Sequence, residues 1–572
     1  MKIVVIAAAC LGLASFAPAS RLLDPAYLNA GSNPRGLASA DLNNDGYADL
    51  AVANFGSATL IGAACPSSGG SISLYLGSAQ GLQPGAVISV SSDAPRGLAL
   101  ADLNNDGKPD LLATLYCSGS LAVYLNQGDG MFGPAQLYPV GAQPVGVAVQ
   151  VANGAGFVAV ADYGSNKVSL FTLNGKNGGL SPLSTLAVGL NPTDVRFYQA
   201  RGKGLALFVA DYGSNAVTRL GLSADGSLAG SADIAVPGQP CKLAVGDLNN
   251  DGLPDLAVSR FMDNTVDVFL GQADGSVAVS PVAQALGGSR PNGLALGRLG
   301  GSAALVTSDR DSDQVEVLHW AGQGLSRCAA VTVTDASGNT GTYGPVEAVV
   351  ADFNADGYGD VAVSHMRDSR VALLVGARSA APLISSASHP DPAGWSASTT
   401  LVAGFSAGPD LDGISGWQAS LDEDPAGAPG ADAPLLSTPS FTQAHLAAGA
   451  HYLHARAIDG AGKAGEVGTY RVGVKAQLTQ ANTYNYPNPS RDGHTTIRFP
   501  LLSPAAVELK IYNETGELVW HRDLGAAQTQ AGLNLVEWDG QTEGGRQAAN
   551  GGYILTVHSG GITITKKIAI VR

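Results

Sequence analysis

Residues 95–111 read PRGLALADLNNDGKPDL, and this pattern recurs along the chain. A proline opens the stretch, an apolar run follows, and a loop of Asp, Asn and Gly leads into a second apolar run. Closely similar stretches begin at Pro34, Pro240 and Pro345. Recurrence at a regular interval indicates an architecture built from one repeated structural unit.

Three further copies fill the intervals between these four. They begin at Pro144, Pro192 and Pro291, and they have lost the acidic loop. Consecutive prolines are 48 to 61 residues apart. In the second repeat, apolar or alternating runs at 97–101, 110–115 and 120–125 read as short strands. A four-stranded unit of about 50 residues is typical of a propeller blade, whereas independent β-sandwiches would need about twice that length. Residues 24–378 are therefore predicted to form a seven-bladed β-propeller.

The two ends of the repeat array are predicted to close the ring together. We call the proline that opens each repeat its anchor proline. Repeat 7 ends at the run 371–376 without the strand that precedes the anchor proline in other repeats. The N-terminal stretch 24–36 carries a spare strand before the first anchor proline. We therefore expect residues 25–31 to complete the last blade and to leave no open edge.

The acidic loops follow the pattern D-x-N-x-D-G-x-x-D. Calcium prefers about six to eight oxygen ligands on a flexible loop, and glycine at the sixth position allows a turn that is costly for other residues. Solvated Asx-rich turns would explain the Asp and Asn but not four copies of one spacing. The twelfth position is apolar, so these are hairpin loops and not EF-hands. About four calcium ions are predicted, each held by the side chains at the first, third, fifth and ninth positions and by the backbone at the seventh. These residues are Asp41, Asn43, Asp45, Tyr47, Asp49, Asp102, Asn104, Asp106, Lys108, Asp110, Asp247, Asn249, Asp251, Leu253, Asp255, Asp352, Asn354, Asp356, Tyr358 and Asp360.

The repeat and its acidic loop resemble the FG-GAP/VCBS repeats of integrin-α-like propellers and of many bacterial surface proteins. The resemblance covers residues 24–378. It implies that the calcium ions are structural and that ligand binds elsewhere on the propeller. Repeats 3, 4 and 6 depart from the motif, so no metal is assigned to them.

The N-terminus predicts export. Lys2 precedes an apolar run at 3–16, and Ala17-Pro18-Ala19 has the form of a cleavage site, so residues 1–19 are predicted to be a signal peptide. No later stretch is long and apolar enough to span a bilayer. The mature protein is therefore expected to be secreted or held on the bacterial cell surface.

Cleavage of the signal peptide would leave four cysteines. A disulfide between Cys65 and Cys117 is predicted, because both lie between the second and third strands of adjacent repeats. The formal net charge of −15 opposes binding to nucleic acid, so no nucleic-acid partner is expected.

The chain after the propeller is predicted to hold two β-sandwiches, which makes the whole protein all-β. Residues 379–475 begin with a linker and contain HYLHARAIDGAGKAGEVGTYRVGV at 451–474, which resembles Ig-like or fibronectin type III-like modules. Residues 482–572 contain YPNP at 486–489 and VELKIYNETGELV at 507–519, which resemble the FlgD-like Ig fold and the sorting domains of type IX secretion cargo. The resemblance implies a partner in the secretion machinery, although a structural cap would look similar and Ser490 replaces the usual Phe.

The sequence favours binding over catalysis. It contains no H-E-x-x-H, C-x-x-C, G-x-S-x-G or phosphate-loop motif, and no cluster of His, Arg or Trp is evident at the pore. We therefore expect adhesion to an extracellular protein or glycan, with no enzymatic activity. The alternatives are a polysaccharide-active or lactonase-like propeller and a passive envelope scaffold. The aromatic candidates for a glycan site are Tyr47, Phe55, Tyr116, Tyr163 and Tyr212.

Overall fold

The computed structural model describes residues 20–22, 25–56, 65, 70–90, 93–152, 155–199, 204–299, 302–333, 344–378, 381–394, 396, 398–407, 414–446, 449–459, 464–474, 478–502 and 504–572. The predicted signal peptide, residues 1–19, lies outside this range. The chain divides into two compact units, one holding the propeller and one holding most of the chain after residue 379. The described residues are nearly all β, which confirms the predicted fold class.

The second repeat shows how one blade is built. Its strands are β7 (Pro95–Ala101), β8 (Asp110–Leu115), β9 (Ser120–Tyr124) and β12 (Gln136–Pro139), paired antiparallel in that order. Strand β8 is buried along its whole length, whereas β12 is mostly exposed. Leu111 and Ala113 pack toward the preceding blade, and Leu112 packs toward the following one. Most of the strand is therefore apolar, because both of its faces are covered.

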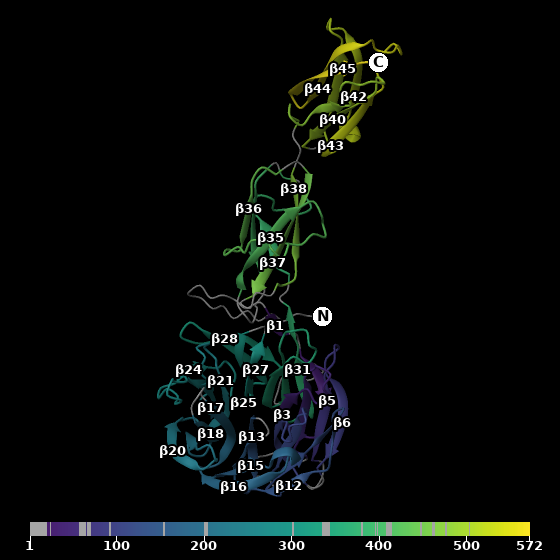
Figure 1. The fold of residues 1–572 in the computed structure, drawn as a ribbon. Coiled ribbons are helices and arrows are strands. Elements are labelled where there is room, and N and C mark those ends of the chain that lie inside the picture. The colour runs from purple at the N-terminus through teal and green to yellow at the C-terminus, as the bar shows by residue number, and fades with distance from the viewer. Residues whose placement is uncertain are drawn as a thin grey trace. The chain divides into compact units, whose positions relative to one another are not determined.

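The described residues contain seven such four-stranded sheets before residue 375 (Figure 1). Besides the sheet above, they are β3 (Pro34–Ala40), β4 (Asp49–Asn54), β5 (Ser71–Leu76) and β6 (Gln83–Ser89); β13 (Pro144–Ala152), β14 (Ala155–Asp162), β15 (Lys167–Leu173) and β16 (Leu180–Ala187); β17 (Pro192–Gln199), β18 (Leu205–Asp211), β19 (Ala216–Leu222) and β20 (Leu228–Ala235); β21 (Pro240–Gly246), β22 (Asp255–Arg260), β23 (Thr265–Phe269) and β24 (Val282–Ala285); β25 (Pro291–Leu299), β26 (Ser302–Asp309), β27 (Gln314–Ala321) and β28 (Gly324–Thr332); and β29 (Pro345–Ala351), β30 (Asp360–His365), β31 (Arg370–Leu374) and β2 (Ala26–Asn29). Short strands β10 (Asn126–Gly128) and β11 (Met131–Phe132) pair with each other, as do β1 (Ser20–Leu22) and β32 (Gly376–Arg378).

The ring closes through the N-terminal strand. The first strand of each sheet contacts the first strand of the next, in the cycle β3, β7, β13, β17, β21, β25, β29 and back to β3. Strand β2 pairs antiparallel with β31, with Tyr27 opposite Ala372. This pairing confirms the prediction that residues 25–31 complete the last blade.

A disulfide joins the first two blades. Cys65 and Cys117 are bonded, with Cα atoms 5.7 Å apart, which confirms the predicted pair. The bond connects residues 52 positions apart in the sequence.

The second unit contains two sets of paired sheets. The first set has β33 (Leu383–Ser386), β34 (Leu401–Ser406) and β36 (Ser440–Gln443) in one sheet, and β35 (Ile414–Asp422), β37 (Gly449–Asp459) and β38 (Gly468–Val474) in another. The second set has β39 (Tyr484–Tyr486), β40 (Thr495–Leu501) and β43 (Gly532–Trp538) in one sheet, and β42 (Leu518–Leu524), β41 (Val507–Tyr512), β44 (Gly551–Ser559) and β45 (Ile562–Ile570) in another.

The core of the second set lies between its two sheets. It includes Phe499, Leu509, Trp538 and Leu555, all fully buried. The only helices among the described residues are the short 3₁₀ turns Gly175–Asn177 and Ala526–Gln528. Neither is long or apolar enough to cross a membrane.

Candidate functional site

The acidic loop between β7 and β8 folds its polar side chains over a single turn. The Asp106 N–H donates to Asp102 Oδ1 at 3.1 Å and to Asn104 Oδ1 at 2.9 Å. The Gly107 N–H donates to Asp102 Oδ2 at 2.8 Å. Gly107 has a φ of +83°, and no atom lies within 4 Å of where its Cβ would be. Backbone conformation, and not lack of space, therefore requires glycine at the sixth position.

The fifth and seventh positions complete the turn. Asn104 Nδ2 donates to Asp106 Oδ2 at 3.1 Å, and the Lys108 N–H donates to Asp106 Oδ1 at 3.0 Å. The side chains at the first, third and fifth positions are thus held close together by the backbone of their own loop.

The aspartate at the ninth position lies at the base of the loop. Asp110 is fully buried and accepts the Leu103 N–H at 2.9 Å and the Asn126 N–H at 2.8 Å. These bonds tie the loop to the segment that follows β9. Burial raises the pKa of Asp110, and the nearby charges of Asp106 and Asp102 add to the rise.

The other three loops repeat this geometry. The buried ninth-position aspartates each accept two backbone N–H groups, at 2.7 and 2.7 Å for Asp49, 3.0 and 2.8 Å for Asp255, and 2.9 and 2.7 Å for Asp360. Burial, with the two neighbouring aspartates, raises the pKa of Asp360 to about 7. The first- and third-position side chains of each loop accept the backbone N–H of the fifth residue at 3.0 or 3.1 Å.

The hydrogen bonds show that each loop brings together three of its four predicted side-chain ligands. The first, third and fifth side chains share one turn, and the ninth lies beneath it. In the described part of the chain, no three carboxylate, imidazole or thiol groups gather as metal ligands. The four loops nevertheless fit calcium chemically, because the side chains offer only hard oxygen donors. None of the ion pairs found among the described residues includes a loop aspartate. The corresponding turns of repeats 3, 4 and 6 fall largely outside the described residues.

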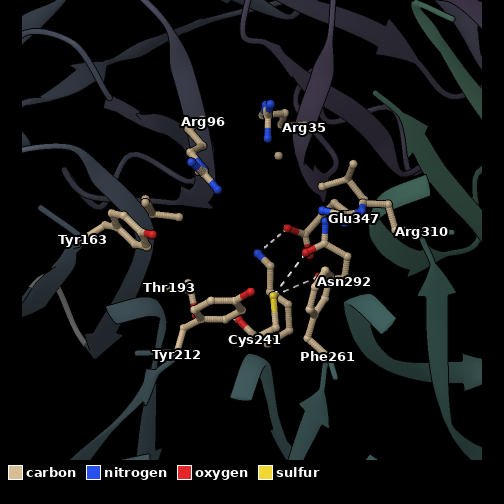
Figure 2. A pocket seen from close by; sticks show the side chains of 15 residues that line it. Arg35, Arg96, Tyr163, Thr193, Tyr212, Cys241, Phe261, Asn292, Arg310 and Glu347 are labelled. Carbon is tan, nitrogen blue, oxygen red and sulfur yellow. Dashed lines mark hydrogen bonds and ion pairs between the residues drawn. The ribbon is translucent and has the colours of Figure 1, made fainter. Parts of the chain in front are cut away.

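A central pocket opens at the other end of the same strands. It is a cavity of about 180 Å³ (Figure 2). The residue that follows each anchor proline lines it, so every blade contributes one side chain. These seven residues are Arg35, Arg96, Val145, Thr193, Cys241, Asn292 and Val346.

A second set of repeat-equivalent residues forms another part of the wall. Tyr163, Tyr212, Phe261 and Arg310 each come directly after the second strand of their blade, and all four line the pocket. Figure 2 shows these side chains around the cavity, together with Arg35 and Arg96.

Some charged groups in the pocket form ion pairs, whereas others have buried nitrogens without a hydrogen-bond partner. Lys242 forms an ion pair with Glu347, and Arg310 bonds Asp311 at 3.1 Å. Arg35 Nε and Nη2 are buried without a hydrogen-bond partner, as is Arg96 Nη1.

The pocket corrects one expectation from the sequence. No Arg cluster was evident at the pore, yet the structure brings Arg35, Arg96 and Arg310 to its wall. Arg35 and Arg96 could have been predicted to lie together, because each occupies the same position in its repeat, directly after the anchor proline. Of the aromatic candidates, Tyr163 and Tyr212 line the pocket, whereas Phe55 and Tyr116 are buried and Tyr47 lies in an acidic loop.

Comparison with known families finds three matching segments. Residues 33–61 match the FG-GAP repeat, residues 102–166 match the FG-GAP-like repeat, and residues 486–561 match the FlgD Ig-like domain. The chain therefore carries FG-GAP repeats and a C-terminal FlgD Ig-like domain, which confirms the resemblance to FG-GAP repeats and to the FlgD-like Ig fold. FG-GAP repeat domains are typically extracellular.

Several solved structures are similar to this chain. A protein from Lactobacillus plantarum is 19% identical with a TM-score of 0.43, over 54% of this chain and 87% of that one. A putative 6-phosphogluconolactonase from Bacteroides uniformis is 16% identical with a TM-score of 0.41, over 52% and 84%. A functionally unknown protein from Desulfotomaculum acetoxidans is 12% identical with a TM-score of 0.41, over 53% and 90%. No curated protein matches the chain.

Proposed function

We propose that this chain is an extracellular binding protein of the adhesive type, whose propeller is stabilised by calcium in the four acidic loops. Its partner is an extracellular protein or glycan. The observation that carries the calcium part is the repetition of one oxygen-rich loop geometry four times without a cationic partner among the described ion pairs. In the second blade, Asp102, Asn104, Asp106 and Asp110 would hold the ion with the backbone carbonyl of Lys108. Bound calcium would neutralise the crowded carboxylates and brace the hairpin.

Calorimetry of the mature chain tests the calcium part. Metal that binds only the folded state adds about 2.7 kcal/mol per site when free metal is 100 times its Kd. We expect the melting temperature of the propeller to rise with calcium, to rise less with magnesium, and to fall with chelator. Asp102→Ala should remove one bound calcium and leave the other three. An unchanged melting temperature with no calcium in metal analysis would refute this part.

The central pocket favours binding over catalysis. Glu347 is paired with Lys242, and burial raises the pKa of the Cys241 thiol to about 11, so little thiolate forms near neutral pH. The pocket lining includes no histidine. We expect no turnover of lactones or polysaccharides above the buffer rate. Turnover that is lost on Glu347→Gln and kept on Glu543→Gln would favour the enzyme instead.

The C-terminal FlgD Ig-like domain is proposed to direct late export or surface retention. Support comes from exposed apolar side chains on the outward face of the sheet of β39, β40 and β43, where Tyr486 is 71% exposed and Leu535 is 60% exposed. Arg498 and Glu537 lie on the same face. A sorting receptor could contact this face. Residues 482–572 are deleted in the native host, and cell fractionation then locates the truncated chain. We expect to find it in the periplasm. Normal surface delivery of the truncated chain would eliminate the sorting role and leave a structural cap.

A further inference from the structure

Two of the three guanidinium groups of the central pocket, those of Arg35 and Arg96, are held in place by aromatic rings of their own blades. The Arg35 guanidinium lies over the Phe55 ring at 4.7 Å from its centroid, and the Arg96 guanidinium lies over the Tyr116 ring at 5.5 Å. Stacking covers a face of each guanidinium and leaves its N–H edges available for in-plane acceptors. The pocket thus presents two oriented hydrogen-bond forks.

Some N–H groups of both guanidinium groups have no acceptor. Arg35 is 4% exposed, and its Nε and Nη2 have no hydrogen-bond partner. Arg96 Nη1 is also buried without a partner. An unpaired buried donor costs about 1–3 kcal/mol, more for a charged group. Such donors also occur singly outside the pocket, for example at Arg370 Nη1, so the feature that distinguishes the pocket is that two arginines with such donors line one cavity. A ligand acceptor in this cavity could satisfy the donors of both arginines.

The local charge agrees with an anionic ligand. Glu347 already pairs with Lys242, and Arg310 pairs with Asp311. Burial and the neighbouring Arg96 guanidinium lower the pKa of Arg35. An oxyanion between the two guanidinium groups would offset both the burial of their charge and their mutual repulsion. The chain as a whole carries −15, so the basic lining of this pocket contrasts with the net charge of the chain.

The rest of the wall suits a hydroxylated ring. Tyr163, Tyr212 and Phe261 supply aromatic surface, and Thr193 and Asn292 supply short polar groups. A cavity of about 180 Å³ is smaller than the pockets of about 300–1,000 Å³ that hold drug-sized ligands, so it suits a small molecule with a single ring. The oxyanion and the ring can therefore belong to the same small molecule.

We infer that the central pocket binds an acidic sugar unit, with its oxyanion held by Arg35 and Arg96 and its ring against Tyr163 and Tyr212. Paired guanidinium groups recognise carboxylate, sulfate and phosphate through the same bidentate geometry. This inference rests on the proposed role as a binding protein, and it names the chemistry of one ligand.

Isothermal titration of the full mature chain in calcium buffer tests the inference. The probes are glucuronate, glucose 6-phosphate, glucose 6-sulfate, inorganic sulfate and neutral glucose. We expect at least one acidic sugar to bind at least tenfold more tightly than both glucose and inorganic sulfate, and the three acidic sugars identify which oxyanion is preferred. Arg96→Gln should weaken that binding at least tenfold. Arg370→Gln is the matched control, because Arg370 also stacks on an aromatic ring, that of Tyr27, but does not line the pocket.

A second variant guards against misfolding. Tyr212→Ala should weaken the acidic sugar and leave inorganic sulfate binding unchanged, while the calorimetric transition of both variants is checked against the parent. The inference is overturned if glucose binds as well as the acidic sugars, if sulfate alone binds as tightly, or if Arg96→Gln has no effect. Calcium stoichiometry measured on the same sample separates the two proposals. Acidic sugar binding without calcium would support the pocket and overturn the metal sites, and calcium binding without any acidic sugar would do the reverse.

Discussion

The ninth-position aspartate is expected to stabilise the propeller even without metal, unlike the fifth-position aspartate of the same loop. Replacing Asp110 by Ala leaves the buried N–H groups of Leu103 and Asn126 without the acceptors they have at 2.9 and 2.8 Å. Each unmade bond costs about 1–3 kcal/mol, and removal of a buried charge returns part of that. We therefore expect Asp110→Ala to lower the free energy of unfolding by about 2–4 kcal/mol in chelator. Asp106 is exposed and bonds only within its own turn, so Asp106→Ala should cost less than about 1 kcal/mol there.

Urea titration followed by circular dichroism measures both variants, first in chelator and then in saturating calcium. In calcium, each variant should lose the stabilisation of one site in addition, about 2.7 kcal/mol at 100 times Kd. Asp110→Asn keeps one acceptor oxygen and should fall between the parent and Asp110→Ala. Equal losses for Asp106→Ala and Asp110→Ala in chelator would show that the ninth aspartate has no separate structural role.

Three further outcomes follow from the fold. Deletion of residues 24–33 should lower the melting temperature of the propeller in calorimetry, because β31 loses its partner strand and becomes an open edge; melting like that of the mature chain would refute the closure. Burial raises the pKa of Asp162 and of Asp211 from the ordinary value to about 6. The stability that each protonated side chain contributes is therefore complete below the ordinary pKa and is lost as the pH rises through about 6, by about 3 kcal/mol each. The double variant Asp162→Asn/Asp211→Asn should therefore show a smaller fall in melting temperature between about pH 4 and 7 than the parent, and an identical profile would contradict the reasoning. Ala355 has a φ of +53° where the other three acidic loops have asparagine, so Ala355→Asn should raise the free energy of unfolding by about 0.5–1 kcal/mol in urea titration, and a loss would show that the local backbone preference is overridden.

The acidic loops and the strands around them are readable from the sequence, because their interactions are local. The hydrogen bonds among Asp102, Asn104, Asp106 and Gly107 span at most five positions. The proline spacing gives the blade length, and mostly apolar runs such as 110–115 follow from burial on both faces. Even the closing strand could be predicted, because its absence at one end and its surplus at the other are both visible in the chain.

The central pocket could not be read in the same way, because its residues meet only when the ring closes. Arg35 and Arg96 are 61 positions apart and stand alone in their own repeats. The residues that follow the anchor prolines differ in type from one repeat to the next. The sequence around each of them does not indicate that they line one cavity. Closure places one such residue from every blade around a single cavity. The chemistry of that cavity is therefore a property of the tertiary structure, since it depends on how seven separate positions are combined and not on the pattern within any one of them.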